Sequence, residues 1–276
     1  MILTAPRRIR RWRLTALIGL LAVAIAAPAA VLGAPTTAAS ADVAAARHRD
    51  LLPNLQMAPL RDLRIQQPLD QPGRTLLRFT TTMVNAGAGP LEMHGKRQPG
   101  AKTMRTWQRI FQTGGTYRDV PTKVTASFAS AQGHDHWHFA RMQRYQLWST
   151  ASPGGAVLRG AKIGFCFEDG VQVRYDLPGA PTTPVYEGCG RRSSTRITVG
   201  ISVGWADIYD WAVAYQWIDI TGLASGDYRM CITANPKGVL REATRKDNET
   251  WTDITLDMSA SPPTVEVLQQ RRQTCR

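Results

Sequence analysis

The sequence predicts an all-β fold, an antiparallel β-sandwich-like single domain with long loops, preceded by a signal peptide. Short runs rich in Val, Ile, Thr and aromatic residues alternate with clusters of Gly, Pro, Asn and Asp, which is the pattern of strands joined by turns. Apolar residues in these runs recur with a period of two, and no segment sustains the 3.6-residue period of an amphipathic helix. Roughly 235 residues follow the signal, enough for one well-cored domain.

The N-terminal segment has the composition of a secretory signal. Residues 1–13 contain five arginines and no acid, an apolar run follows over 14–34, and small residues end it at Ala39–Ala41. This order predicts a signal peptide over 1–41, cleaved near Asp42. An uncleaved anchor is the alternative, because the apolar run approaches the length of a membrane span. Both interpretations predict a protein that is secreted or associated with the cell envelope.

Residues 42–75 are predicted to form an N-terminal arm, with a short helix or extended segment over 42–60 and an isolated, exposed His48. The domain itself is predicted over 76–276. Strands are expected in four runs that end or begin at turn residues: "LLRFTTTMVN", "AKIGFCFED", "QWIDITGL" and "YRMCITANP".

The charge balance limits the classes of partner. Without residues 1–41 the chain carries 29 basic and 21 acidic residues, a net charge of +8. Such a surplus favours anionic partners such as a cell-wall polymer or a membrane surface, and it does not steer the chain toward lysine-rich polymers. No basic run is interleaved with aromatic residues, and export argues against nucleic acid as a partner.

Four cysteines follow the predicted signal: Cys166, Cys189, Cys231 and Cys275. An even number in an exported chain predicts two disulfides. The sequence allows three pairings. We expect Cys166–Cys189 and Cys231–Cys275, because this arrangement staples one long loop and the C-terminal tail. None of the cysteines has the C-x-x-C spacing of a redox or zinc site.

The segment "GHDHWHFARMQRYQLW" holds three of the five histidines of the chain, His134, His136 and His138. We expect "HDHWHFARMQRYQLW" to form a strand, on which these three side chains share one face. Gly133 provides a bend that would let the third reach the same ion. Three imidazoles without a nearby thiolate favour copper or zinc over calcium or magnesium. A polar strand face with solvated histidines is the alternative.

Two later segments help to decide which metal and which chemistry the histidines serve: "GAKIGFCFEDG" and "GISVGWADIYDWAVAYQWIDIT". Together with the histidine strand, they resemble the catalytic domain of the lysyl oxidase family, in order and in interval, over about 76–248. The resemblance implies that the three histidines hold Cu²⁺ and that Lys162 and Tyr209 form lysine tyrosylquinone. Asp207 lies two residues before Tyr209 and shares its face on a strand, so we expect it to be the catalytic base.

The resemblance therefore implies that residues 76–276 form a copper amine oxidase of the lysyl oxidase type. Such an enzyme converts primary amines, either lysine side chains of extracellular proteins or small amines, to aldehydes and releases hydrogen peroxide and ammonia. A non-enzymatic copper-binding module of the cell envelope would need the three histidines but neither Lys162 nor Tyr209. A zinc hydrolase, in which the histidines hold an activated water, is the third alternative.

Overall fold

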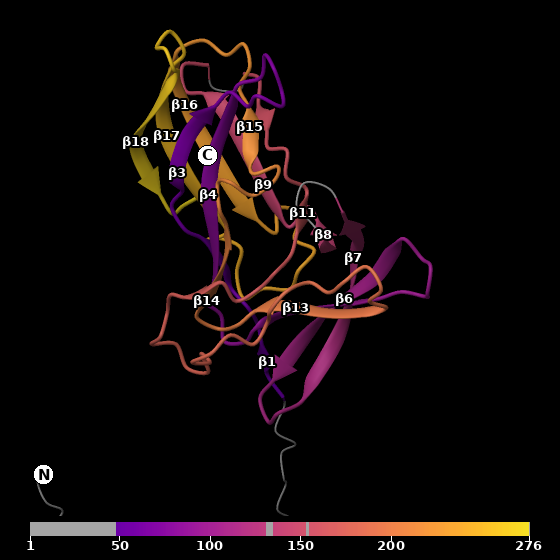
Figure 1. The fold of residues 1–276 in the computed structure, drawn as a ribbon. Helices are drawn as coiled ribbons and strands as arrows, with labels where there is room; N and C mark the ends of the chain where they lie inside the picture. The colour runs from indigo at the N-terminus through magenta and orange to yellow at the C-terminus, as the bar shows by residue number, and fades with distance from the viewer. Residues whose placement is uncertain (1–47, 131–134, 153–154, 276) are drawn as a thin grey trace, which may run out of the picture. The chain divides into compact units, whose positions relative to one another are not determined.

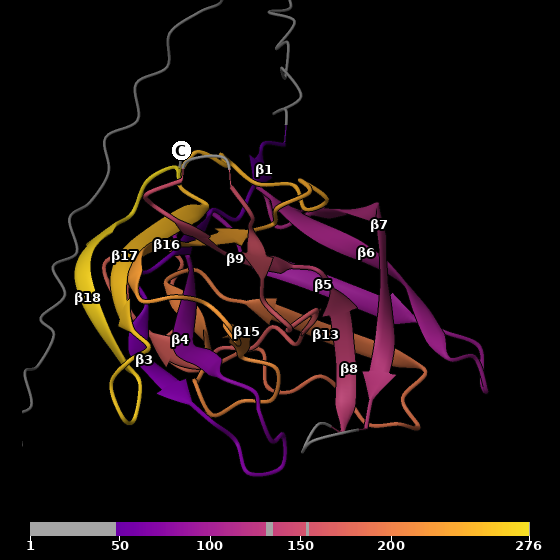
Figure 2. The same ribbon diagram turned by 90° about the horizontal axis from the view of Figure 1, so that it is seen from above.

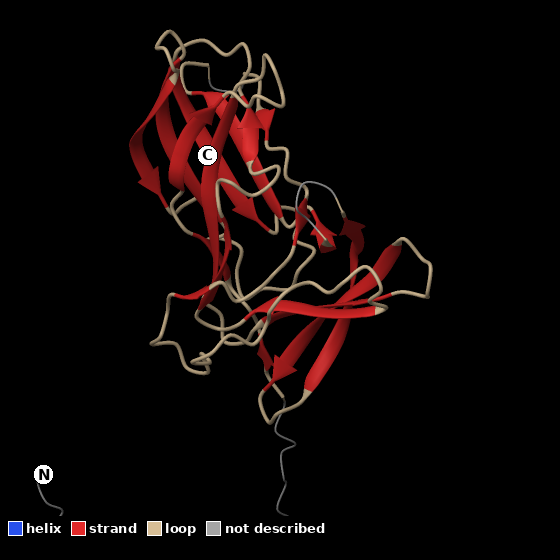
Figure 3. Cartoon of the chain, viewed as in Figure 1, coloured by secondary structure: helices blue, strands red, loops and turns tan. Residues whose placement is uncertain are grey.

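A computed structural model describes residues 48–130, 135–152 and 155–275. These residues form strands, turns and loops, and none of them lies in a helix (Figure 3). Every pairing between the described strands is antiparallel. The all-β prediction is therefore confirmed.

The predicted signal peptide over 1–41, its alternative as an anchor, and residues 42–47 of the arm lie outside the described residues. Within the described part of the chain, no helix is long and apolar enough to cross a membrane.

The strands form three sheets. The first has the order β11-β8-β7-β6-β5-β13, with β1 on β6. Its strands are β1 (Asp50–Leu51), β5 (Leu91–Lys96), β6 (Thr103–Gln112), β7 (Tyr117–Ala129), β8 (His136–Ala140), β11 (Gly164–Phe165) and β13 (Arg196–Ile201).

The second sheet has the order β10-β9-β16-β17-β18, and the third has the order β12-β14-β4-β15, with β2 and β3 also on β4. Figures 1 and 2 both show β16, β17 and β18 side by side. The second sheet comprises β9 (Gln143–Ser149), β10 (Leu158–Arg159), β16 (Gly226–Ala234), β17 (Glu249–Asp257) and β18 (Thr264–Arg271). The third comprises β2 (Leu55–Met57), β3 (Arg61–Gln66), β4 (Leu76–Asn85), β12 (Val171–Gln172), β14 (Trp205–Tyr209) and β15 (Trp217–Asp219).

The second and third sheets pack against each other. Strands β2 and β3 contact β16 and β18, and Phe79 of β4 meets Tyr145 of β9 edge to face at 5.1 Å between ring centroids. Phe79 is fully buried and Tyr145 is nearly so. The two sheets thus share a buried apolar core, as expected of a sandwich.

The described part of the predicted arm is extended chain that joins the sheets. Strand β1 pairs with β6, while β2 and β3 pair with β4. The helix alternative is not found over residues 48–60, because Leu55, Met57 and Leu60 bury their side chains in the domain core. The exposure expected for His48 is confirmed.

Residues 136–149 form two strands, so the prediction of one continuous strand through this segment is wrong. Strand β8 ends at Ala140, and Arg141 has a left-handed φ of 61°. The backbone nitrogen of Arg141 donates to the carbonyl of Ile163 at 2.7 Å. The chain thereby turns out of the first sheet and enters the second as β9, which places the histidine strand where two sheets meet.

The remaining predicted strands are found with shorter bounds in two cases. "LLRFTTTMVN" is β4 over its full length and "YRMCITANP" lies largely in β16. "QWIDITGL" and "AKIGFCFED" contain only the short strands β15 and β11. The two expected disulfides, Cys166–Cys189 and Cys231–Cys275, are both present.

Candidate active site

A cavity of about 680 Å³ brings together five of the six predicted site residues: His136, His138, Lys162, Asp207 and Tyr209. The sixth, His134, lies outside the described residues. The five come from three places in the chain, namely β8, the segment that leads into β11, and β14. The antiparallel pairing of β8 with β11 brings the histidine strand next to the segment that carries Lys162.

The two described histidines of the cavity point toward one position. Their Nε2 atoms lie 2.9 Å apart, and their rings are nearly perpendicular, with centroids 4.6 Å apart. Two nitrogens that bind one ion at right angles, each at about 2.0–2.1 Å, are themselves about 2.9 Å apart. His138 is 8% exposed. The pair therefore fits a shared metal ion held by imidazole nitrogen, a donor that suits copper and zinc.

Lys162 lies over the ring of Tyr209. Its Nζ is 4.7 Å from the centroid of that ring and 5.6 Å from the centroid of Phe165. Lys162 is 6% exposed, and burial lowers the pKa of its amine to about 8, against the opposing attraction of Asp207. A buried amine with a lowered pKa is nucleophilic over a larger part of the neutral pH range than an exposed lysine.

Two contacts hold the ring of Tyr209 in the cavity wall. Its hydroxyl donates to the carbonyl oxygen of Cys166 at 2.5 Å, and the ring of Phe165 packs against it edge to face at 5.4 Å. Burial raises the pKa of Tyr209 well above its ordinary value, and the neighbouring Asp207 adds to the rise. The phenol is therefore protonated and fixed in orientation beside Lys162.

Asp207 shares the cavity with Tyr209, as the alternation along β14 predicts. It is 1% exposed, and its Oδ2 atom has no hydrogen-bond partner among the described residues. Burial raises the pKa of this carboxyl well above its ordinary value, against the opposing effects of Tyr209 and Lys162. A carboxylate whose pKa is raised is a stronger base than an exposed carboxylate.

Three further charged residues line the cavity that the sequence did not single out: Glu168, Glu187 and Arg191. The sequence contained a signal for Glu168, because it is an even number of positions from Lys162 and Cys166 and would share their face of an extended segment. No local pattern points to the other two. They are brought to the cavity by the disulfide from Cys166 to Cys189.

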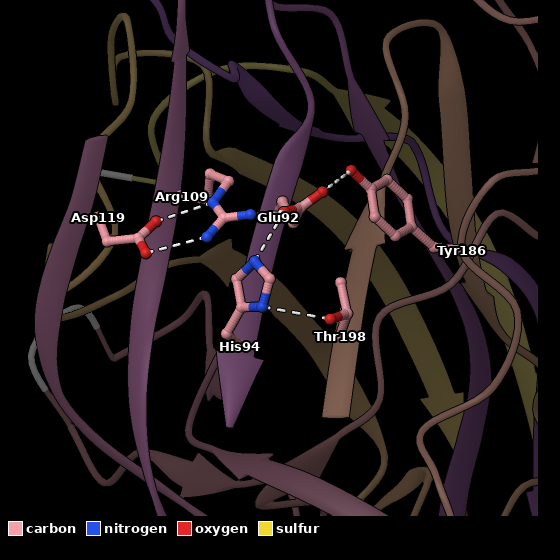
Figure 4. Close-up of polar contacts among 6 residues, drawn as sticks. All are labelled: Glu92, His94, Arg109, Asp119, Tyr186 and Thr198. Carbon is pink, nitrogen blue, oxygen red and sulfur yellow. Dashed lines mark hydrogen bonds and ion pairs between the residues drawn. The ribbon is translucent and has the colours of Figure 1, made fainter. Parts of the chain in front are cut away.

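Residues 187–191 line the cavity. The preceding residue, Tyr186, is fastened to the first sheet by a second polar cluster, shown in Figure 4. The hydroxyl of Tyr186 donates to Oε2 of Glu92 at 2.7 Å. His94 Nε2 donates to Oε1 of the same carboxylate at 2.7 Å, and Arg109 pairs with Asp119 at 2.8 Å. His94 is thus engaged by a carboxylate apart from the cavity, and its role here is structural.

A second group of potential metal ligands, Cys231, Glu249 and Cys275, lies within 4.8 Å. Both sulfurs form the disulfide between Cys231 and Cys275. Since the thiolate is the form of cysteine that binds a metal, this group offers none, and the histidine pair remains the better candidate.

Comparisons with known proteins agree with the resemblance seen in the sequence. The family model described as lysyl oxidase matches residues 91–262. The chain is 30% identical over 152 residues to protein-lysine 6-oxidase of Gallus gallus, which covers 55% of this chain and 33% of that protein.

The same enzyme from Sus scrofa is 30% identical over 146 residues, covering 52% of this chain and 53% of that protein. Lysyl oxidase homolog 1 of Homo sapiens is 29% identical over 146 residues, covering 52% of this chain and 23% of that protein. The match thus spans between about a quarter and a half of these relatives' own lengths.

Proposed function

The chain belongs to the lysyl oxidase family, and on that premise we propose that it is a copper- and quinone-dependent amine oxidase. It oxidises primary amines, lysine side chains or small amines, to aldehydes and releases hydrogen peroxide and ammonia. The observation that carries the proposal is the buried amine of Lys162, 4.7 Å from the ring centroid of Tyr209 and in the same cavity as two convergent histidines.

In this proposal His134, His136 and His138 hold Cu²⁺, and Lys162 and Tyr209 are the source of lysine tyrosylquinone. Once formed, the copper and quinone pair supplies a two-electron oxidant for the amine that dioxygen regenerates. Lys162 contributes a nucleophilic nitrogen, because burial lowers its pKa to about 8. The hydrogen bond from Tyr209 to the Cys166 carbonyl keeps the ring in reach of that nitrogen.

Asp207 is the proposed base of the reaction. Asp207 lines the cavity that also holds Lys162 and Tyr209, and its Oδ2 has no hydrogen-bond partner among the described residues. It is therefore placed to take the α-proton of a bound amine. The small side chains of Ala212 and Ala214 line the same cavity and leave room for the alkyl part of a substrate. Secretion or attachment to the cell envelope belongs to the same proposal, and it is supported by the two disulfides.

The first test is a peptide map of the protein after loading with copper in air and treatment with a carbonyl reagent. We expect one species that joins the Lys162 peptide to the Tyr209 peptide and carries the reagent. Peroxide release from a primary amine should accompany it.

The alternatives are separated by replacing Tyr209 with Phe. The Tyr209→Phe protein should bind copper with unchanged affinity and oxidise no amine. Copper bound to the original protein with both peptides free would favour a copper-binding module. Activity that requires zinc in place of copper would favour a hydrolase.

A further inference from the structure

Two segments that meet where β13 pairs with β5 carry an uncompensated positive charge. Residues 94–105 and 190–196 contain seven cations and no acid. They are held together where Arg196 pairs with Lys96 in the ladder of β13 and β5. We call these cations the basic patch: Lys96, Arg97, Lys102, Arg105, Arg191, Arg192 and Arg196.

The charge of the patch is not neutralised within the described chain. None of its seven members forms an ion pair with a described acid. Asp119 lines the cavity beside the patch, but both of its oxygens bind Arg109. Arg97 donates to the carbonyls of Ser194 and Arg192, contacts that orient the guanidinium and leave its charge intact.

Three residues of the patch line a hollow, and a fourth lines the candidate active site. A cavity of about 600 Å³ is lined by Lys96, Arg97 and Arg105, together with the rings of Trp107 and Pro121. Arg191 belongs both to the patch and to the wall of the active-site cavity.

Trp137, between the two described histidines, ties the patch to β8. Its Nε1 donates to the carbonyl of Arg191 at 2.9 Å, and the guanidinium of Arg97 lies 4.9 Å from its ring centroid. One extended ligand can therefore contact the patch and the active-site cavity together.

We propose that the basic patch is a docking surface for an acidic polypeptide, one of whose lysines enters the active-site cavity. The inference rests on the proposed amine oxidase function and adds a substrate class to it. A field of seven cations repels lysine-rich chains and attracts a segment in which the target lysine is flanked by Asp or Glu. A polysaccharide or a lipid surface would satisfy the charge but would bring no lysine to the adjacent cavity.

The test compares three peptides of equal length that hold one lysine flanked by Glu, by Gln or by Arg. We expect kcat/KM of the copper-loaded protein to be about tenfold higher for the Glu peptide than for the Gln peptide, and lowest for the Arg peptide. The preference should vanish at about 1 M salt, where screening reduces the range of charge interactions to about 3 Å.

A matched pair of variants assigns the effect to the patch. The first replaces four exposed cations of the patch with Gln: Lys96, Lys102, Arg105 and Arg196. The control replaces four exposed cations elsewhere with Gln: Arg61, Arg159, Lys237 and Lys246. The patch variant should bring the Glu and Gln peptides within twofold of each other, and the control variant should keep most of the preference. Oxidation of butylamine should be unchanged in both.

A binding measurement without turnover tests the docking surface separately from the amine oxidase activity. The Glu peptide should bind the Tyr209→Phe protein, measured by fluorescence anisotropy, and the four patch substitutions should weaken that binding about tenfold. Equal kcat/KM for the Glu and Gln peptides, with butylamine still oxidised, would overturn the docking surface and leave the proposed function standing.

Binding of the Glu peptide through the patch, without oxidation of any amine, would overturn the amine oxidase function and leave the docking surface standing. Tight binding of polygalacturonate or of anionic vesicles, with no binding of the Glu peptide, would overturn the choice of a polypeptide partner.

Discussion

Replacing Tyr186 with Phe should destabilise the protein through the buried carboxylate of Glu92. The two residues are 7% and 9% exposed, and the Tyr186 hydroxyl donates to Oε2 of Glu92 at 2.7 Å. A hydrogen bond to a charged group contributes about 1.5–3 kcal/mol. We therefore expect the Tyr186→Phe protein to lose about 2 kcal/mol of unfolding free energy at pH 7, or about 4–8 °C in Tm for a domain of this size.

The loss should depend on pH. Burial alone would raise the pKa of Glu92, but hydrogen bonds from His94 and Tyr186 outweigh it and hold this pKa below its ordinary value of 4.5. A carboxyl group with a lowered pKa stabilises the fold above that ordinary value, and the stabilisation is lost as the pH falls through the pKa of the folded state. The difference between wild type and Tyr186→Phe should therefore shrink below about pH 4.

Tyr228→Phe is the matched control. Tyr228 is 8% exposed, and its hydroxyl donates to a neutral acceptor, the carbonyl of Ala224, at 2.9 Å. Its loss should cost about 1 kcal/mol at every pH. Unfolding by urea at pH 7 and at about pH 3 measures both variants. Equal losses for the two, or a loss at Tyr186 that does not change with pH, would refute this account of the Glu92 cluster.

Three further predictions concern the site. A Cβ at position 164 would lie 2.6 Å from Nδ1 of His138, so Gly164→Ala should displace that ring. Copper binding, measured in a competition titration, should weaken about 10–100-fold. An unchanged affinity would argue against His138 as a ligand. Because burial lowers the pKa of Lys162 to about 8, the rate of quinone formation, followed with a carbonyl reagent, should rise as the pH increases through that value; a flat rate from about pH 7 to pH 9 would contradict it. Removing the Cys231–Cys275 bridge, whose cysteines are 44 residues apart, should lower the free energy of unfolding by about 4 kcal/mol and spare amine oxidation. Removing the Cys166–Cys189 bridge, with a separation of 23, should lower it by about 3 kcal/mol and also impair oxidation, because Cys189 lies in the cavity wall. Equal loss of activity in the two variants would contradict that role of the wall.

Much of the candidate site could be predicted from local patterns. The alternation His136-Trp137-His138 places both imidazoles on one strand face, and the spacing of Asp207 and Tyr209 does the same on β14. These are properties of two to five consecutive residues in extended chain, so they need no knowledge of the partner strand.

The all-β fold was predictable on similar grounds, from the period-two runs. The even cysteine number predicted two disulfides but left three pairings open. What local patterns missed is the turn at Arg141, where a left-handed residue breaks the expected strand. Arg is not a typical turn residue, and its conformation is supported by a contact with Ile163, 22 residues further along the chain.

The sequence by itself determined which side chains could do chemistry and which of them share a face, because side-chain direction follows from the two-residue period of a strand. Only the tertiary structure decided which faces meet. It brings Lys162 over Tyr209, ties Tyr186 to Glu92, and sets Arg196 beside Lys96. These contacts join residues that are tens of positions apart. Their register is set by the pairing and packing of whole sheets, which no short stretch of sequence specifies.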